Sequence, residues 1–200
     1  ILVPLFLRER PGEKLLPWTK GEASKIAAKI QLHSWKGIFK SLYKVFFLPV
    51  SFMMGIAAFS FSVGRGLIDT VLPVFTVQEL GWADTDYSQI FATANLISGI
   101  GGMIIGGFLI DYFGKVKMIT VYMSLLITLV AAMSFLKSFW HNEMFVVGFI
   151  IGFYILLTFT TIAIFASAMQ LCWKRISVTQ FTLYMAISNL GLAAGAALMG

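Results

Sequence analysis

The stretch Gly106-Gly-Phe-Leu-Ile-Asp-Tyr-Phe-Gly-Lys-Val-Lys-Met118 joins two long apolar runs through a short charged turn. Gly107 and Asp111 are four residues apart, so on a helix they share one face. Gly114 suits the left-handed position that ends a helix, and the two lysines after it lie where the last carbonyls and lipid phosphates attract cations. Taken alone, this pattern also fits an ordinary lysine-capped helix end between two membrane spans.

The composition around this turn is that of a membrane protein. Hydrophobic residues make up 58% of the 200 residues, charged residues 12%, and the mean hydropathy is +0.87. A soluble domain carries about 25% charged residues. The apolar runs are continuous and do not alternate, which favours helices over the strands of a β-barrel. The sequence therefore predicts an all-α, polytopic transmembrane helix bundle.

The net charge of +6 is distributed in a way that indicates a membrane surface and not a nucleic acid. Nine of the 15 basic residues lie in residues 8–44, and four others, Lys115, Lys117, Lys174 and Arg175, lie in two later connections. These three groups occupy alternate connections between apolar runs, so the positive-inside rule predicts that all of them are cytoplasmic. The single Cys172 provides no disulfide framework.

The apolar runs divide the chain into three parts. We expect residues 1–7 to end a preceding span, residues 8–45 to form a basic cytoplasmic loop with a short amphipathic helix starting near residue 20, and residues 46–200 to form a half-bundle. The chain would thus be part of a longer polytopic protein. The spans predicted within the half-bundle are residues 46–77, 87–112, 118–136, 144–171 and 177–200. The first of them has two expected weak points, Gly64-Arg65-Gly66 and Pro73.

The pattern Gly-x-x-x-Asp-x-x-Gly-Lys-x-Lys resembles the loop signature of the major facilitator superfamily, which recurs after the eighth helix of that fold. Its place here, after the second of five spans, agrees with the C-terminal half of a twelve-helix transporter. The resemblance implies three partners: the N-terminal half of the same transporter, membrane lipids and a small-molecule substrate. It also implies a gating role for Gly107, Asp111, Gly114, Lys115 and Lys117, in which the aspartate caps a neighbouring helix and Gly107 allows a close approach.

Two shorter stretches resemble the branch of that superfamily that contains the muropeptide permease AmpG and the acetyl-CoA transporters. One runs from Gly64-Arg-Gly-Leu-Ile-Asp69 to Thr76-Val-Gln-Glu-Leu-Gly-Trp82, and the other covers residues 179–191. A lysine-containing segment is expected on this helix of the permease, where the present chain has Gly-Arg-Gly.

Arg65 and Asp69 are the only charges well inside an apolar run, and their i, i+4 spacing lets them pair on one helix face. Two interpretations stay open: a protonatable Asp69 that exchanges a proton as substrate binds, or an ion pair that fixes this helix against its neighbours. Tyr154 and Thr158 are weaker candidates. Uncharged polar side chains that either line a substrate path or join helices by hydrogen bonds are Asn95, Gln170, Gln180, Tyr184 and Asn189.

Catalytic signatures such as His-Glu-x-x-His, Gly-x-Ser-x-Gly or a P-loop are missing from the sequence, so we predict no enzyme, no cofactor and no metal site. The predicted function is secondary active transport of a small solute by alternating access, as a proton symporter in the inner or plasma membrane. The alternative is a membrane sensor or enzyme scaffold whose catalytic part lies outside this segment.

Overall fold

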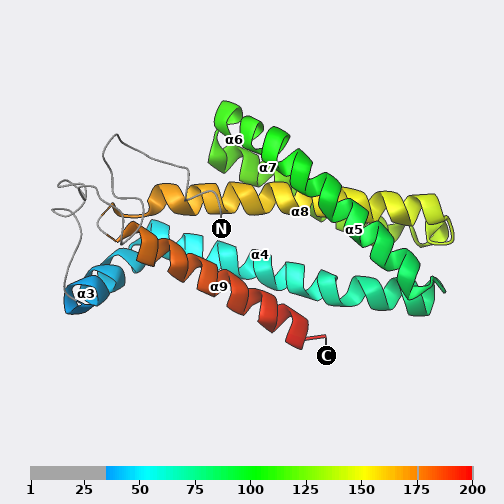
Figure 1. Ribbon diagram of the computed structural model, residues 1–200, viewed down its shortest axis with the longest axis horizontal. Helices are drawn as coiled ribbons and strands as arrows, with labels where there is room; N and C mark the ends of the chain where they lie inside the picture. Colours follow the sequence, from blue (N-terminus) through cyan, green and yellow to red (C-terminus); the bar gives the residue numbers. More distant parts are fainter. Residues whose placement is uncertain (1–34, 175, 200) are drawn as a thin grey trace, which may run out of the picture.

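The computed structural model describes residues 35–174 and 176–199 (Figure 1). Within these ranges all regular structure is helical. The expectations for residues 1–7 and for an amphipathic helix starting near residue 20 lie outside the described residues. Because the regular structure of the described residues is helical throughout, the predicted all-α helix bundle is confirmed.

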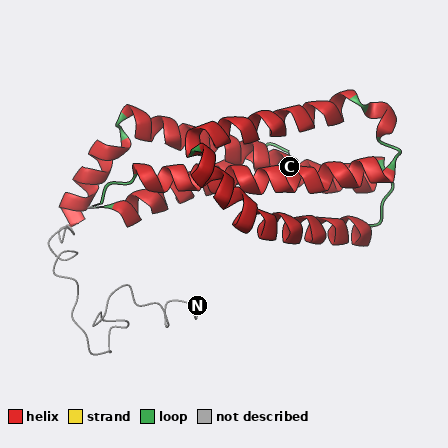
Figure 2. Ribbon diagram, turned by 90° about the horizontal axis from the view of Figure 1, so that it is seen from above, coloured by secondary structure: helices red, strands yellow, loops and turns green. Residues whose placement is uncertain are grey.

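The long helices run along one axis and alternate in direction (Figures 1 and 2). Short π-helical turns, η1 and η2, extend α4 and α5, and a 3₁₀ turn, η3, precedes α8. The elements in chain order are α3 (Trp35–Phe46), α4 (Pro49–Val74), η1 (Phe75–Glu79), α5 (Asp84–Gly101), η2 (Gly102–Gly106), α6 (Gly107–Phe113), α7 (Lys115–Phe135), η3 (Lys137–Phe139), α8 (Glu143–Leu171) and α9 (Ser177–Ala197).

By length and hydropathy, four segments of the described chain are able to cross a membrane. They are Pro49–Glu79, Asp84–Phe113, Lys115–Phe135 and Glu143–Leu171. The helix α9 has 21 residues and a similar length, but it is not among the four. Its Gln180 and Asn189, together with several serines and threonines, lower its hydropathy.

The helices form two groups. A helix pair consists of α4 and α9, which contact each other along most of their length, and a helix trio consists of α5, α7 and α8. α8 is apolar on all sides and is the most buried helix, with Val146, Ile150 and Ala163 fully enclosed. The two groups touch each other at few points, so the space between them is where cavities form.

Glycines bring the two members of the helix pair into backbone contact. A Cβ atom added at Gly66 would overlap the carbonyl oxygen of Leu192, and one added at Gly195 would overlap that of Val63. Small residues at such positions let helices approach closely in a membrane. The expected weak point at Gly64–Gly66 is therefore wrong, because α4 is continuous there and Gly66 serves packing.

In the turn between α6 and α7, Gly114 has φ +91° and ψ 141°. Residues with a side chain rarely adopt this backbone conformation, so a glycine is suited to separate the two helices within one residue. The expected closing position is thus occupied by a glycine with positive φ, although its ψ is extended and not left-handed helical.

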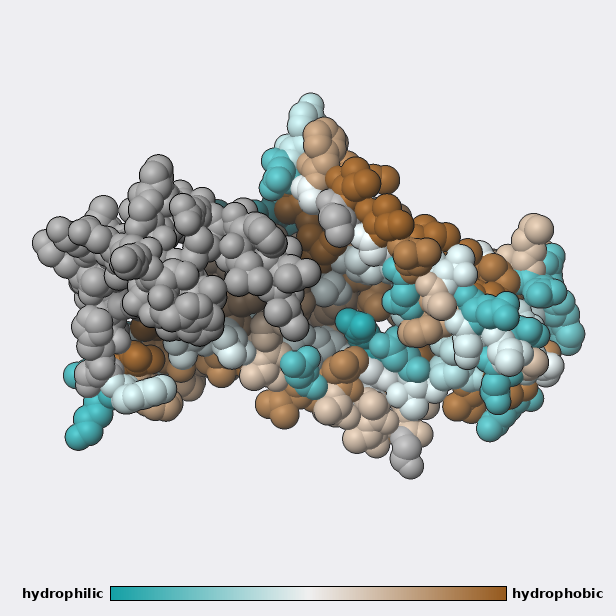
Figure 3. Space-filling model, viewed as in Figure 1, coloured by the Kyte–Doolittle hydropathy of each residue, from teal (hydrophilic) through white to brown (hydrophobic). Residues whose placement is uncertain are grey.

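The surface separates into an apolar flank and polar ends. Apolar side chains follow α5, and hydrophilic residues gather at the end of the bundle opposite α3 (Figure 3). We call that end, which carries Glu79, Asp84, Asp86 and Glu143, the acidic end, and the end with α3, Lys115, Lys117 and Lys174 the basic end. Apolar side chains that are more than 60% exposed along α5 and α6, such as Leu96, Ile104 and Phe108, suit contact with lipid.

Gly66→Ala is expected to lower the stability of the protein by about 1–3 kcal/mol, because the added methyl group must push α9 away from α4. Gly64→Ala is the matched control, since a Cβ there meets nothing within 4 Å. Thermal unfolding of both variants in detergent checks the expectation. Equal melting temperatures for the two variants would contradict the packing described for the helix pair.

Candidate functional site

The charged pair of α4 lies where the helix pair faces the helix trio. Arg65 Nε donates a hydrogen bond to Asp69 Oδ2 at 3.2 Å, and the two side chains are 39% and 31% exposed. The i, i+4 spacing makes this contact possible without distorting the helix. The pairing predicted from the sequence is present.

A buried tyrosine of α8 completes this site. The hydroxyl of Tyr154, which is 2% exposed, donates a hydrogen bond to Asp69 Oδ1 at 3.0 Å. Phe91 of α5 packs edge-on against the Tyr154 ring at 5.1 Å and stacks on Tyr87 at 6.0 Å between ring centroids. Both carboxylate oxygens of Asp69 thus have a donor, and the hydrogen bond from Tyr154 ties α4 to α8.

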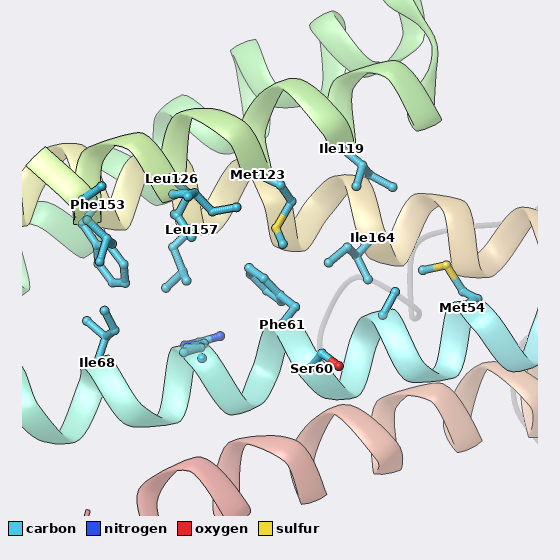
Figure 4. Close-up of a pocket in the computed structure, with 16 residues that line it drawn as sticks. Met54, Ser60, Phe61, Ile68, Ile119, Met123, Leu126, Phe153, Leu157 and Ile164 are labelled. Atoms are coloured by element: carbon cyan, nitrogen blue, oxygen red, sulfur yellow. The ribbon is translucent and has the colours of Figure 1, made fainter.

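A cavity of about 570 Å³ lies between α4, α7 and α8 (Figure 4). Figure 4 shows Phe61 of α4 pointing toward Met123 of α7 and Leu157 of α8 across this space. Its lining is almost wholly apolar, and Arg65 is the one charged side chain that the described residues contribute to it. The cavity can therefore hold an apolar group beside a single positive charge.

A second, smaller cavity of about 180 Å³ lies between α4, α8 and α9, and Arg65 lines it too. Ser62 and Ser188 approach each other across it, with their hydroxyl oxygens 2.6 Å apart. Thr161 and Asn189 also line this cavity. It is the more polar of the two, so the Arg65 side chain stands between an almost wholly apolar space and a partly polar one.

Gln180 and Tyr184 lie away from both cavities, in the packing at the basic end. Both are fully buried. Gln180 accepts a hydrogen bond from the backbone N–H of Trp173 at 2.9 Å, and the Tyr184 hydroxyl donates to the carbonyl of Ser51 at 3.3 Å. These bonds join α9 to the end of α8 and to α4, which is the interhelical alternative considered for such residues.

Two other predicted polar residues are exposed and line neither cavity. Asn95 donates to the carbonyl of Phe91 on its own helix at 2.8 Å. Gln170 lies in the last turn of α8. Of the predicted uncharged polar residues, only Asn189 shares a cavity with Arg65.

The predicted gating residues surround the turn between α6 and α7. Asp111 is exposed, and among the described residues none forms an ion pair or hydrogen bond with it. Lys115 Nζ donates to the carbonyl of Ala166 near the end of α8 at 3.4 Å, and Lys117 lies 5.9 Å from the centre of the Phe113 ring.

The close approach between α5 and α8 occurs earlier in the chain than the resemblance implied. A Cβ at Gly102 would lie 2.7 Å from Thr158 Cγ2, and one at Gly106 would lie 3.3 Å from the Phe159 ring. A Cβ at Gly107 would meet nothing within 4 Å. In this conformation Gly102 and Gly106 therefore supply the contact surface.

Sequence reasoning gave too little weight to Tyr154 and did not single out Ser62. One signal for Tyr154 was present: it is the one tyrosine of the most apolar helix, and a buried tyrosine hydroxyl needs a hydrogen-bond partner. Asp69 is the one carboxylate deep inside a span that could accept it. For the serine pair no such signal exists, because serine is common in membrane helices.

These features define a polytopic membrane protein with a polar internal site. They are apolar helices long enough to cross a membrane, a charged pair between two helix groups, and the glycine-lysine turn between α6 and α7. The sequence profile of the Major Facilitator Superfamily matches residues 1–196. The chain therefore belongs to this superfamily, whose members are membrane transporters and not enzymes. Comparison with curated proteins gave no match, and neither did comparison with solved structures.

Tyr154→Phe is expected to destabilise the protein by about 0.5–1.5 kcal/mol, because the Oδ1 atom of Asp69 loses its donor. Tyr122→Phe is the matched control: its buried hydroxyl has no partner among the described residues, so its removal should be neutral or stabilising. Thermal unfolding in detergent compares the two. A more damaging Tyr122→Phe would contradict this assignment.

Proposed function

We propose that this chain forms most of one half of a secondary active transporter that moves a small solute by alternating access, coupled to protons. The observation that carries the proposal is the Arg65–Asp69–Tyr154 network. The network holds a carboxylate within a predicted span, pairs it with an arginine that lines two cavities, and connects the two helix groups. Ionisable residues inside membranes typically mark substrate paths and proton relays.

Protonation of Asp69 would change two contacts at once. It removes the negative charge that pairs with the Arg65 guanidinium, and it weakens the acceptor of the Tyr154 hydroxyl. The tie between α4 and α8 then loosens, and the helix pair gains freedom to move against the helix trio. A proton at this carboxylate is thus able to shift the balance between two arrangements of the helices.

The charge distribution supports an orientation for this transporter. The basic end, with Lys115, Lys117 and Lys174, would face the cytoplasm of a cell with the protein in its inner or plasma membrane. Asp111 is exposed at that end, which leaves it accessible to a donor on the N-terminal half of the same transporter. Such a contact would stabilise one conformation, as the resemblance to the loop signature implies.

Asp69→Asn is expected to abolish proton movement with the solute, because the amide cannot ionise while its shape is kept. The measurement uses the full-length transporter in proteoliposomes that enclose a pH-sensitive dye. Muropeptides, acyl-CoAs, siderophores and sugars are added in turn, the first two because of the branch that the sequence resembles. At least one solute should evoke a pH change with the wild type and none with the variant.

Asp86→Asn is the control for this experiment, since its exposed carboxylate at the start of α5 lies at the acidic end and away from both cavities. It should retain the wild-type pH change. Uptake without any pH change, or an equal pH change in Asp69→Asn, would reduce the network to a structural ion pair. Failure of every solute would favour the sensor or enzyme-scaffold alternative.

A further inference from the structure

We propose that the transported solute carries an anionic group, a carboxylate or a phosphate, which binds Arg65 in competition with Asp69. This inference rests on the proposed transport function and adds the chemical class of the solute. It also explains how solute and proton are coupled: the solute anion replaces Asp69 as the partner of the Arg65 guanidinium.

The geometry of Arg65 leaves donors for such a group. Asp69 engages Nε, at the inner edge of the guanidinium, and no hydrogen bond or ion pair with another described residue involves the two terminal nitrogens. The planar guanidinium fork binds carboxylates and phosphates through two parallel hydrogen bonds. Because the Arg65 side chain is 39% exposed and lines both cavities, a solute in either cavity reaches it.

The surroundings of Arg65 match an anion that carries both apolar and polar parts. The cavity of about 570 Å³ between α4, α7 and α8 offers apolar walls, whereas the smaller one offers the hydroxyls of Thr161 and Ser188 and the amide of Asn189. Among the described residues, no carboxylate lines these cavities, and Asp69 is the one carboxylate paired with Arg65. An incoming anion therefore meets one competing charge.

The exchange accounts for the charges at each stage. Before binding, the Arg65 cation is paired with the Asp69 carboxylate. When the solute anion takes its place, Asp69 is left facing Tyr154 of α8 and Tyr87 of α5, with no cation among the described residues other than Arg65 nearby. Asp69 then takes up one proton from the aqueous side to which the site is open, and the O–H bond formed neutralises it. A solute with a single negative charge and one proton then cross together without net charge.

The test measures binding to the purified full-length protein with matched probes. Each probe pair has one carbon skeleton and differs in charge: succinate and succinamide, hexanoate and hexanamide, glycerol phosphate and glycerol. The readout is the rise of the melting temperature with probe concentration, which gives an apparent Kd. At least one anion should stabilise the wild type, while its neutral counterpart does not.

The variants distinguish competition from simple attraction. Arg65→Gln should weaken anion binding by about 30-fold or more, and Arg65→Lys should lie between it and the wild type. Asp69→Asn should bind the same anion more tightly, by roughly tenfold, because the competing carboxylate is gone. A merely structural role of the pair would make Asp69→Asn weaken binding or leave it unchanged.

Several results would overturn the anion assignment. These are stabilisation by no anion at all, equal stabilisation by a neutral probe, and unchanged anion binding in Arg65→Gln. If a neutral or cationic solute still evokes the Asp69-dependent pH change in proteoliposomes, proton-coupled transport stands and the anionic class falls. The two proposals therefore fail separately.

A second inference concerns α3, at the basic end. Its exposed face alternates aromatic and cationic residues at helical spacing. Trp35, Phe39 and Tyr43 are 64–77% exposed, and each is followed by an exposed lysine, namely Lys36, Lys40 and Lys44. Phe47, directly after the helix, is 57% exposed. The opposite face is already occupied, because Val45 is buried and the Phe46 ring lies 6.3 Å from that of Tyr184 on α9. We infer that the exposed face of α3 binds the anionic headgroups of the membrane.

The pattern fits that partner in two ways. Aromatic rings with a polar edge prefer the headgroup level of a bilayer, and lysines on a helix attract anionic lipids from the same depth. α3 continues directly into α4, whose first residue, Pro49, starts a predicted span. The chain therefore fixes α3 at the depth where a span begins, beside the lipid headgroups.

Hydrogen–deuterium exchange of the full-length protein tests this surface in nanodiscs of phosphatidylcholine with and without phosphatidylglycerol. Segment 35–48 should gain protection with the anionic lipid, and the triple variant Lys36→Gln, Lys40→Gln, Lys44→Gln should lose that gain. Peptides from α8 serve as the internal control for folding. Equal protection in both lipids, or protection in detergent alone, would show that apolar insertion or another protein surface covers α3, and would overturn the inference.

Discussion

The hydrogen bond from Tyr154 to Asp69 is the contact on which the arrangement of the two helix groups depends. The helix pair and the helix trio touch at few points and leave cavities between them. Apart from the bonds that Gln180 makes at the basic end, the Tyr154–Asp69 bond is the polar tie between the two groups among the described residues, so it has large leverage there. Arg65 holds the same carboxylate from within α4. A change in the charge of Asp69 therefore acts at the point where the two groups are joined, and packing inside each group is left intact.

Packing within each helix group is close, whereas the contact between the two groups is sparse. Gly66, Gly191 and Gly195 bring the backbones of α4 and α9 together, and about half of the membrane-crossing part of α8 is buried. Each group can then move as a body, because side chains within it have little room to rearrange. Under the proposed alternating access, such bodies would transmit a local change across the width of a membrane.

Much of the fold could be predicted because it depends on patterns that are local in the sequence. Long apolar runs, alternating basic connections and the hinge around Gly114 are sufficient to predict a helix bundle of this family. The pairing of Arg65 with Asp69 follows from a spacing of four residues. Tyr154 lies 85 positions from Asp69, so their contact depends on the packing of α4 on α8, which no local pattern specifies. For the same reason the sequence could not separate Asn189, which lines a cavity, from Gln180, which is buried in packing.

The central claim is that the charge of Asp69 holds the helix pair to the helix trio. Distance measurement between spin labels tests it most directly, with labels on exposed residues of the two groups at the acidic end, Val71 on α4 and Met144 on α8, in a Cys172→Ser background. The full-length protein with Asp69→Asn should show a longer or broader distance distribution than the same protein with Asp69 intact, because the tie to Tyr154 is weakened. Identical distributions in the two proteins would contradict the account.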